Sequence, residues 1–303
     1  MTLEKEIVQL LKEKGPLTGS EMWDGIGGDQ FALWRACMLS KDLSIHRIGT
    51  RYLRLDRRVK GFARLSPSIL REFLTYSVIG SAEDLKALAL RAQQISLSIE
   101  EVSRTKSQLA YSVVSALANQ LETELPIKEE VSFIIAGDIV YNMAHDVPRP
   151  ERSTGKLVKG SDMDLVVVVD DRFPQALTRR LDEAIYGEKY RLLITPHIRE
   201  EIDYVVKNME RVREQFGFDT YRHMVACKIM EEGTLLYGSE KIFRQIKAML
   251  KERGITEKLR AMEQEAQQFR EEAEKYLVLE GEKSLHGEDT YLFYPSEESE
   301  EFE

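Results

Sequence analysis

The clearest alternation of apolar and polar positions lies between residues 127 and 240. VSFIIAG (131–137), LVVVV (165–169) and EIDYVVKN (201–208) are short runs typical of strands, the first two buried on both faces. Helical spacing predicts helices over 138–145, 173–190 and 209–231, and GTLLYG (233–238) closes with a further strand. Strands that alternate with helices indicate a mixed α/β layer.

Residues 1–62 have a different pattern. Leu3, Ile7, Leu10 and Leu11 form one helical stripe, Gly15-Pro16 ends it, and two further short helices follow on either side of Gly27-Gly28. SIHRIGTRYLRLD (44–56) predicts two strands joined at Gly49-Thr50 as a hairpin. Helix, helix-turn-helix and then a β-hairpin is an order that resembles a winged-helix domain.

Helical patterns connect and follow these two regions. Residues 63–126 predict a helical connector, with a stretch almost free of breakers over 82–125 that suits a long helix, a helical hairpin or a coil that forms a homodimer. Residues 241–280 predict charged helices interrupted near Gly254, and 281–303 predict an acidic, flexible tail. The expected fold class is α+β multidomain, and the largest domain, a mixed sheet with helices, is expected at 127–240.

Charge and cysteine content narrow the classes of protein. A net charge of −9 argues against a generally basic nucleic-acid binder, yet residues 46–64 hold seven Lys or Arg against one Asp. The arginines in and beside the predicted hairpin are candidate DNA or RNA contacts, and a protein-contact role is equally open; they are Arg47, Arg51, Arg54, Arg57 and Arg58. Two cysteines without a CxxC pair, and no signal-peptide or membrane-length run, predict a cytoplasmic protein without a membrane partner.

The candidate chemistry is carried by carboxylates. In GSDMDL (160–165), Asp162 and Asp164 are alternate residues of a strand, so both carboxylates point to one side, about 6–7 Å apart along it. Two clustered anions favour a cation between them, and oxygen donors without His or Cys suit Mg²⁺ or Mn²⁺. Asp203 on the next strand is the best third ligand, with Glu201 in reserve.

These residues resemble the nucleotidyltransferase superfamily typified by DNA polymerase β. The family motif is a strand ending in a small-residue turn, here Ile135-Ala136-Gly137-Asp138, followed by a strand bearing Asp-x-Asp and a third Asp later. The resemblance covers about 110 residues, and it implies that two metal ions on Asp162, Asp164 and Asp203 serve transfer of a nucleoside monophosphate from an NTP, with ATP the first candidate, to a hydroxyl. Gly137, Asp138, Lys159, Gly160 and Ser161 are the implied nucleotide contacts.

The chain departs from the family pattern at the turn. Asp138 replaces the usual Ser or Gly, and its charge would repel phosphates unless it faces away or binds metal. A long insert brings Arg149, Arg152, Lys156 and Lys159, which can replace the lost phosphate contacts. The alternatives are a DNA-binding regulator whose nucleotidyltransferase fold senses a nucleotide without turnover, and an interaction scaffold built on the long helices.

Overall fold

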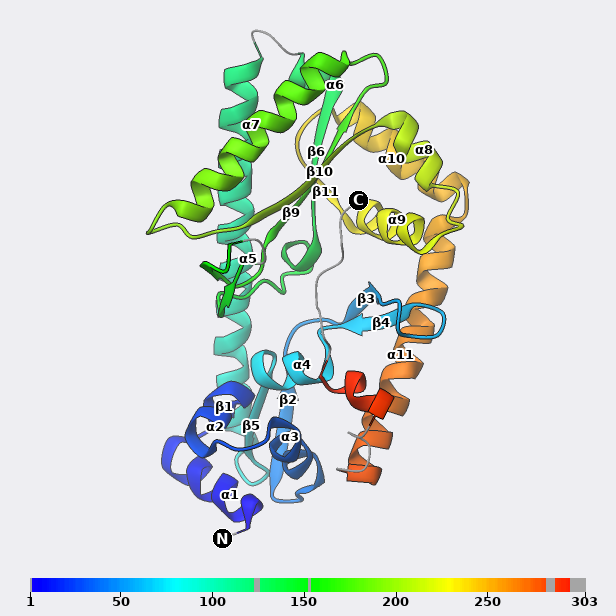
Figure 1. Cartoon of the computed structure of the whole chain (residues 1–303). Helices are drawn as coiled ribbons and strands as arrows, with labels where there is room; N and C mark the ends of the chain where they lie inside the picture. Colours follow the sequence, from blue (N-terminus) through cyan, green and yellow to red (C-terminus); the bar gives the residue numbers. More distant parts are fainter. Residues whose placement is uncertain (1, 123–125, 152–153, 282–286, 295–303) are drawn as a thin grey trace. The chain divides into compact units, whose positions relative to one another are not determined.

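The computed structural model describes residues 2–122, 126–151, 154–281 and 287–294, and Figure 1 shows the chain. The chain is mixed α/β with small sheets, as the sequence predicts at that coarse level. Two compact units divide it: of the described residues, the first unit holds those up to Ser98 and those from Met262 onward, and the second holds Ile99–Ala261. No helix in the described part of the chain is long and apolar enough to cross a membrane.

The second unit is built on a four-stranded sheet of order β10-β9-β6-β11. Its strands, all predicted from the sequence, are β6 (Val131–Ala136), β9 (Met163–Val169), β10 (Ile202–Asn208) and β11 (Thr234–Gly238). β10 runs parallel to β9, whereas β6 is antiparallel to both β9 and β11. The start of β9, the start of β10 and the end of β6 therefore meet at one edge of the sheet.

Helices cover both faces of this sheet (Figure 1). They are α5 (Leu85–Leu121), α6 (Ile127–Glu130), α7 (Gln175–Ile194), α8 (Met209–Gln215), α9 (Tyr221–Glu232) and α10 (Glu240–Glu252). Phe133, Leu165 and Val167 pack with residues of α5 and α7 in one core cluster. Ile134 and Val166, which alternate with them, are buried on the opposite face, where α9 and α10 contact β6.

The segment after β6 differs from the prediction. The sequence predicts a helix over 138–145, but the structure has only a 3₁₀ turn, η1 (Gly137–Ile139). Gly137 and Asn142 both adopt positive φ, 72° and 55°, which a continuing α-helix excludes. A short hairpin, β7 (Pro148–Pro150) with β8 (Leu157–Lys159), then leads into β9.

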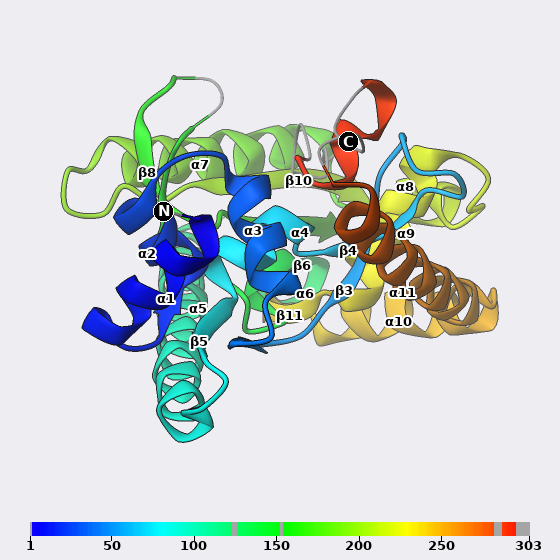
Figure 2. The ribbon, with the colours of Figure 1, turned by 90° about the horizontal axis from the view of Figure 1, so that it is seen from below.

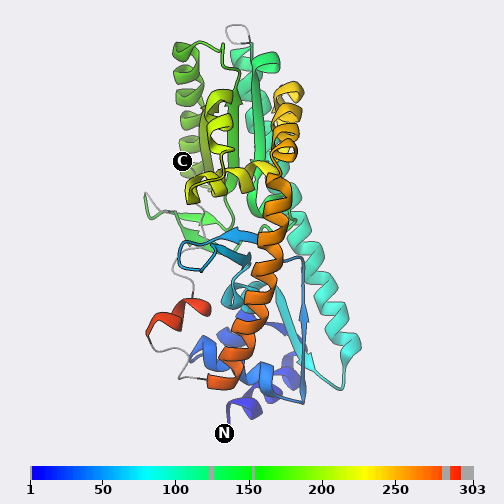
Figure 3. The ribbon, with the colours of Figure 1, turned by 90° about the vertical axis from the view of Figure 1, so that its right-hand side faces the viewer.

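The first unit combines the N-terminal elements with the part of a long C-terminal helix from Met262 onward (Figures 2 and 3). Its elements are α1 (Leu3–Lys14), β1 (Leu17–Thr18), α2 (Gly19–Ile26), α3 (Gln30–Leu39), β2 (Leu43–Arg47), β3 (Tyr52–Leu55), β4 (Ala63–Ser66), α4 (Ile69–Thr75), β5 (Ser77–Ser81), α11 (Ile255–Glu280) and η3 (Gly287–Leu292). One core cluster joins Ile7, Phe31 and Trp34 to Leu277 and Phe293.

The predicted hairpin at 44–56 is wrong in its pairing. β2 pairs with β5 in a sheet of order β1-β5-β2, and β3 pairs with β4. The two strands that the sequence joins at Gly49-Thr50 are real, but each has its partner further along the chain.

The predicted connector and tail also need correction. Residues 63–66 and 77–81 are strands rather than helix, because β4 and β5 complete the sheets of the first unit. Between them α4 is a short helix, and Leu85–Leu121 forms the long one. The helices at 240–252 and 255–280 confirm the predicted interruption near Gly254. In the acidic tail, Phe293 is fully buried in the first unit's core, whereas 282–286 and 295–303 lie outside the described residues.

Candidate active site

Three aspartates meet at the sheet edge where β9 and β10 begin. Asp162 directly precedes β9, Asp164 is its second residue, and the parallel register sets Asp203 of β10 opposite Asp164. A carboxylate oxygen from each lies within 4.8 Å of the other two, and all three residues are half-buried. The structure thus brings together the three acids that the sequence singles out.

The electrostatics of this cluster favour a cation. Burial, followed by the nearby carboxylates of Asp162 and Asp203, raises the pKa of Asp164 well above its usual range. Lys189 Nζ lies 3.8 Å from Asp203 Oδ1, and Arg149 Nη2 lies 3.3 Å from Asp162 Oδ2. Three close carboxylates with hard oxygen donors fit Mg²⁺ or Mn²⁺, which would offset their mutual repulsion.

The turn after β6 contacts this cluster directly. Ala136, the last residue of β6, pairs with Asp164, and Gly137 follows with a φ of 72°. A Cβ at Gly137 would lie 2.0 Å from Asp164 Oδ2. Glycine is therefore required both by the backbone conformation and by the approach of the turn to the acid.

Asp138, the unusual residue of the turn, lies beside the cluster and bonds to the segment before β9. Its Oδ2 accepts a hydrogen bond of 2.8 Å from Ser161 Oγ, and its charge contributes to the raised pKa of Asp164. Ser161 Oγ also accepts from the backbone N–H of His145 at 3.2 Å. Two of the predicted nucleotide contacts, Asp138 and Ser161, are thus bonded to each other.

Gly160 and two basic residues of the insert, Arg149 and Lys159, contact the segments around Asp162. A Cβ at Gly160, which has a φ of 57°, would lie 1.9 Å from the carbonyl oxygen of His145. Arg149 donates from Nε to the Gly160 carbonyl at 2.7 Å and pairs with Glu201 at 2.9 Å. Lys159 Nζ donates to the His197 carbonyl at 3.1 Å.

The other candidates in this region are placed as follows. Glu201, the reserve third acid, pairs with Arg149 while Asp203 joins the cluster, and burial raises the pKa of Glu201. Lys156 is exposed beyond β7, and Arg152 lies outside the described residues. Lys207, a weaker candidate for phosphate contact, is buried near the opposite end of β10 and donates to Gln215 Oε1 at 2.9 Å.

Glu232, at the end of α9, is a site residue that the sequence reasoning missed. Its Oε1 accepts the backbone N–H of Gly137 at 3.1 Å, and its Oε2 accepts the hydroxyl of Tyr141 at 2.9 Å and pairs with Lys228 at 2.9 Å. Its side chain is 4% exposed. No local pattern marks it in the sequence, because its contacts with the turn arise only when β11 pairs with β6.

The five arginines predicted to contact nucleic acid lie in the first unit, and most have other roles. Arg47 and Arg51 pair with Glu274 of α11 at 2.9 and 2.7 Å, and Arg51 also pairs with Glu72. Arg54 is buried. Arg58 pairs with Asp56 at 3.3 Å, and Arg57 is exposed. The structure does not bring these five guanidinium groups together on one uncommitted surface.

The chain matches no protein-family model, no curated protein and no solved structure. The geometry of the acidic site therefore carries the functional conclusion.

Proposed function

We propose that the protein is a divalent-metal-dependent nucleotidyltransferase. The observation that carries this proposal is the aspartate cluster, with carboxylate oxygens of Asp162, Asp164 and Asp203 within 4.8 Å of one another. A glycine turn lies against it, and Gly137 has no room for a Cβ beside Asp164. The aspartates and the glycine turn are both parts of the polymerase β-like motif that the sequence resembles. The proposal applies the nucleotidyltransferase resemblance to the second unit and the winged-helix resemblance to the first.

Each acid has a role in this proposal. Asp162 and Asp164 would hold the ion that binds the triphosphate. Asp203 would be a ligand of a second ion, which would bind the acceptor hydroxyl. Bound divalent ions neutralise phosphate charge and lower the pKa of the attacking hydroxyl. Arg149 orients Asp162 and Glu232 holds the Gly137 turn. Asp203 would take the proton of the acceptor hydroxyl. The chain's own contribution is therefore positioning and charge placement.

Label transfer from each α-³²P-labelled NTP tests the proposal. The full chain is incubated with Mg²⁺ or Mn²⁺ and with total RNA or total protein, and pyrophosphate release is followed in parallel. We expect label on one acceptor class, reduced at least about a hundredfold by Asp164→Asn, because one site ligand is lost. Asp182→Asn, an exposed aspartate of α7, is the matched control and keeps full activity. Equal transfer by wild type and Asp164→Asn would refute the proposal.

Asp138 favours a second candidate function, a regulator that binds a nucleotide without turnover. Its carboxylate occupies the turn where related enzymes hold phosphate, and it lies close enough to Asp164 to raise that residue's pKa. Metal-dependent NTP binding with neither pyrophosphate release nor label transfer, and with transfer still absent in Asp138→Ser, would favour the regulator. Transfer that rises in Asp138→Ser would assign the residue to tuning an enzyme.

A further inference from the structure

Helix α3 of the first unit is covered by the C-terminal part of the same unit. In the winged-helix interpretation, α3 is the helix that would enter the major groove of DNA. Its residues Phe31, Leu33, Trp34 and Cys37 are buried. Arg35, the basic residue of this helix, donates from Nε to the Val278 carbonyl of α11 at 2.9 Å. The contacts of α3 are thus made with its own chain.

Phe293 is the centre of this cover. Its ring is fully buried, and its centroid lies 5.1 Å from that of Phe31, in an edge-to-face arrangement, and 5.3 Å from that of the Trp34 ring. Ala273 and Leu277 of α11 belong to the same core cluster. Aromatic side chains that are fully desolvated in well-packed surroundings are typical anchors of binding interfaces.

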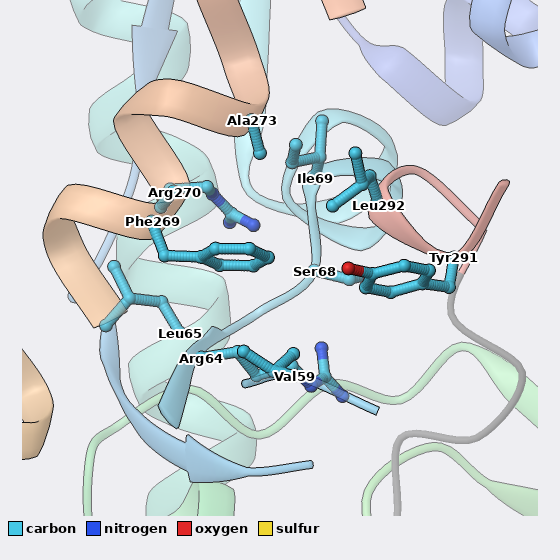
Figure 4. A pocket seen from close by; sticks show the side chains of 10 residues that line it. All are labelled: Val59, Arg64, Leu65, Ser68, Ile69, Phe269, Arg270, Ala273, Tyr291 and Leu292. Carbon is cyan, nitrogen blue, oxygen red and sulfur yellow. The ribbon is translucent and has the colours of Figure 1, made fainter. Parts of the chain in front are cut away.

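Side chains on both sides of Phe293 extend the contact. Tyr294 donates its hydroxyl to Asp29 Oδ2 at 2.9 Å, and Asp29 is the N-cap of α3. The Arg58 guanidinium lies 5.9 Å from the centre of the Tyr291 ring. Tyr291 and Leu292 also close a small cavity of about 30 Å³ against α11, which Figure 4 shows beside Phe269 and Arg270.

The segment has the build of a short ligand. Its backbone closes a turn on itself, with the N–H groups of Phe293 and Tyr294 both donating to the Thr290 carbonyl at 3.3 and 2.9 Å. Four successive side chains of TYLFY (290–294), those of Tyr291, Leu292, Phe293 and Tyr294, contact the rest of the first unit. The aromatic segment therefore complements this unit in shape, with the Phe293 ring packed against Phe31 and Trp34.

We propose that α3 and the adjoining face of α11 form a docking surface for a short aromatic segment, and that residues 290–294 of this chain are its occupant. The first unit is then a peptide-recognition module whose α3 is reserved for protein contact. The proposal is independent of the metal chemistry of the second unit, because each contact that carries it lies within the first unit.

Re-binding of the segment tests the proposal. The full chain with Phe293→Ala is mixed with a fluorescent peptide of residues 287–303, and anisotropy gives the Kd. We expect the variant to bind the peptide at least about tenfold more tightly than wild type, whose surface is already filled. A peptide carrying Phe293→Ala should bind at least about tenfold more weakly, because it lacks the anchor. Leu279→Ala, on a side chain that is 78% exposed, is the control and should behave as wild type.

Hydrogen exchange of the α3 amides provides a second readout. Exchange should quicken in Phe293→Ala and slow again when the wild-type peptide is added. If Phe293→Ala loses its near-UV circular dichroism, Tyr294→Phe takes its place, since it removes only the bond to Asp29; quicker exchange at the start of α3 is then expected. Absence of peptide binding to a folded variant, or equal binding to variant and wild type, would overturn the proposal. So would a gain in affinity for duplex DNA that added peptide does not reverse, because α3 would then bind nucleic acid without being a docking surface for the segment.

Discussion

At the residue scale, Gly137 shows why the turn and the acid pair belong to one site. Its positive φ and the 2.0 Å between a Cβ and Asp164 Oδ2 make two separate demands for glycine. Gly155 has a similar φ of 68° but open space around it, so an alanine there meets the backbone demand alone. A comparison of alanine substitutions at Gly137 and Gly155 therefore separates the effect of backbone strain from the effect of displacing the Asp164 carboxylate.

We predict that Gly137→Ala weakens Mn²⁺ binding at least about tenfold, because the methyl group displaces the Asp164 carboxylate. Gly155→Ala should leave metal affinity unchanged, although both variants lose roughly 1 kcal/mol to backbone strain. Titration calorimetry with Mn²⁺ and thermal unfolding measure the two effects. Equal metal affinity in the two variants would show that Asp164 is not a ligand.

Lys207 predicts a pH dependence of stability. Burial lowers the pKa of Lys207 to about 8 in the folded chain. The unfolded chain has the ordinary lysine pKa of about 10.4, so between pH 8 and 10.4 it binds more protons than the folded chain, and stability rises with pH. Below pH 8 the ammonium is buried in its charged form and destabilises the fold.

We expect Lys207→Met to remove this dependence. Urea unfolding of wild type at pH 7.5 and pH 10 should show a gain with pH that exceeds the gain of Lys207→Met by about 2 kcal/mol, at about 1.4 kcal/mol for each unit of pKa shift. Because the comparison is between pH values within each protein, the lost bond to Gln215 does not affect it. Parallel pH profiles would contradict the buried ammonium.

Residue spacing determines which site residues the sequence could reveal. Asp162 and Asp164 share a side because strand residues alternate, and Asp203 joins them because a parallel neighbour begins at the same sheet edge. Glu232 satisfies the Gly137 N–H from the end of a helix about 95 residues away, where no local pattern marks it. Contacts of that kind depend on tertiary packing and are visible only in the structure.

At the element scale, too, local patterns in the sequence reveal some elements, whereas the pairing of others depends on tertiary structure. The four strands of the second unit's main sheet contain five to seven residues each and are predicted from the sequence, whereas the three-residue β7 and β8 are not. β4 and β5 are no shorter than β3 and β2, but they flank α4 and the sequence predicts one helical stretch there, so it joins β2 and β3 to each other instead of to them. Pairing in the first unit is fixed by non-local partners.

A buried ion pair attaches α5 to the loop before β10. Lys106 of α5 pairs with Glu200 and donates to the Lys159 carbonyl at 2.6 Å, and its side chain is 3% exposed. Burial raises the pKa of Glu200, while Lys106 opposes that rise. Lys106 therefore holds the segments that precede Asp162 and Asp203 against the long helix.

We predict that Lys106→Met costs about 3 kcal/mol of unfolding free energy at pH 7, because it leaves the Glu200 carboxylate buried without its cation. Lys106→Met with Glu200→Gln should recover at least half of that loss. Urea denaturation of the two variants and of Glu200→Gln completes the double-mutant cycle. Additive losses would mean that the two side chains do not interact.

At the scale of the whole molecule, each unit has a core of its own. The cluster around Phe133 and Val167 draws on residues from Val102 to Tyr237, and the cluster around Phe31 draws on residues up to Ile79 and from Ala273 onward. The two clusters share no residue, although α5 and α11 each contribute to both units.

We expect residues 99–261, expressed alone, to fold cooperatively and to bind Mn²⁺ with an affinity within about tenfold of that of the full chain, because a core within one continuous segment suffices for a domain. Circular dichroism on heating and calorimetry with Mn²⁺ measure this. The same segment with Asp164→Asn is the control for the site. A segment that remains unfolded would show that the second unit depends on the first.

The burial of Phe293 in the first unit also fixes an order of events during synthesis. At roughly 5–20 residues per second, a ribosome delivers Phe293 about 10–40 s after Ser98. During that interval the second unit is synthesised, while Phe31 and Trp34 still lack the ring that buries them. The nascent first unit thus presents an open aromatic pocket to chaperones until its own late-arriving segment closes it.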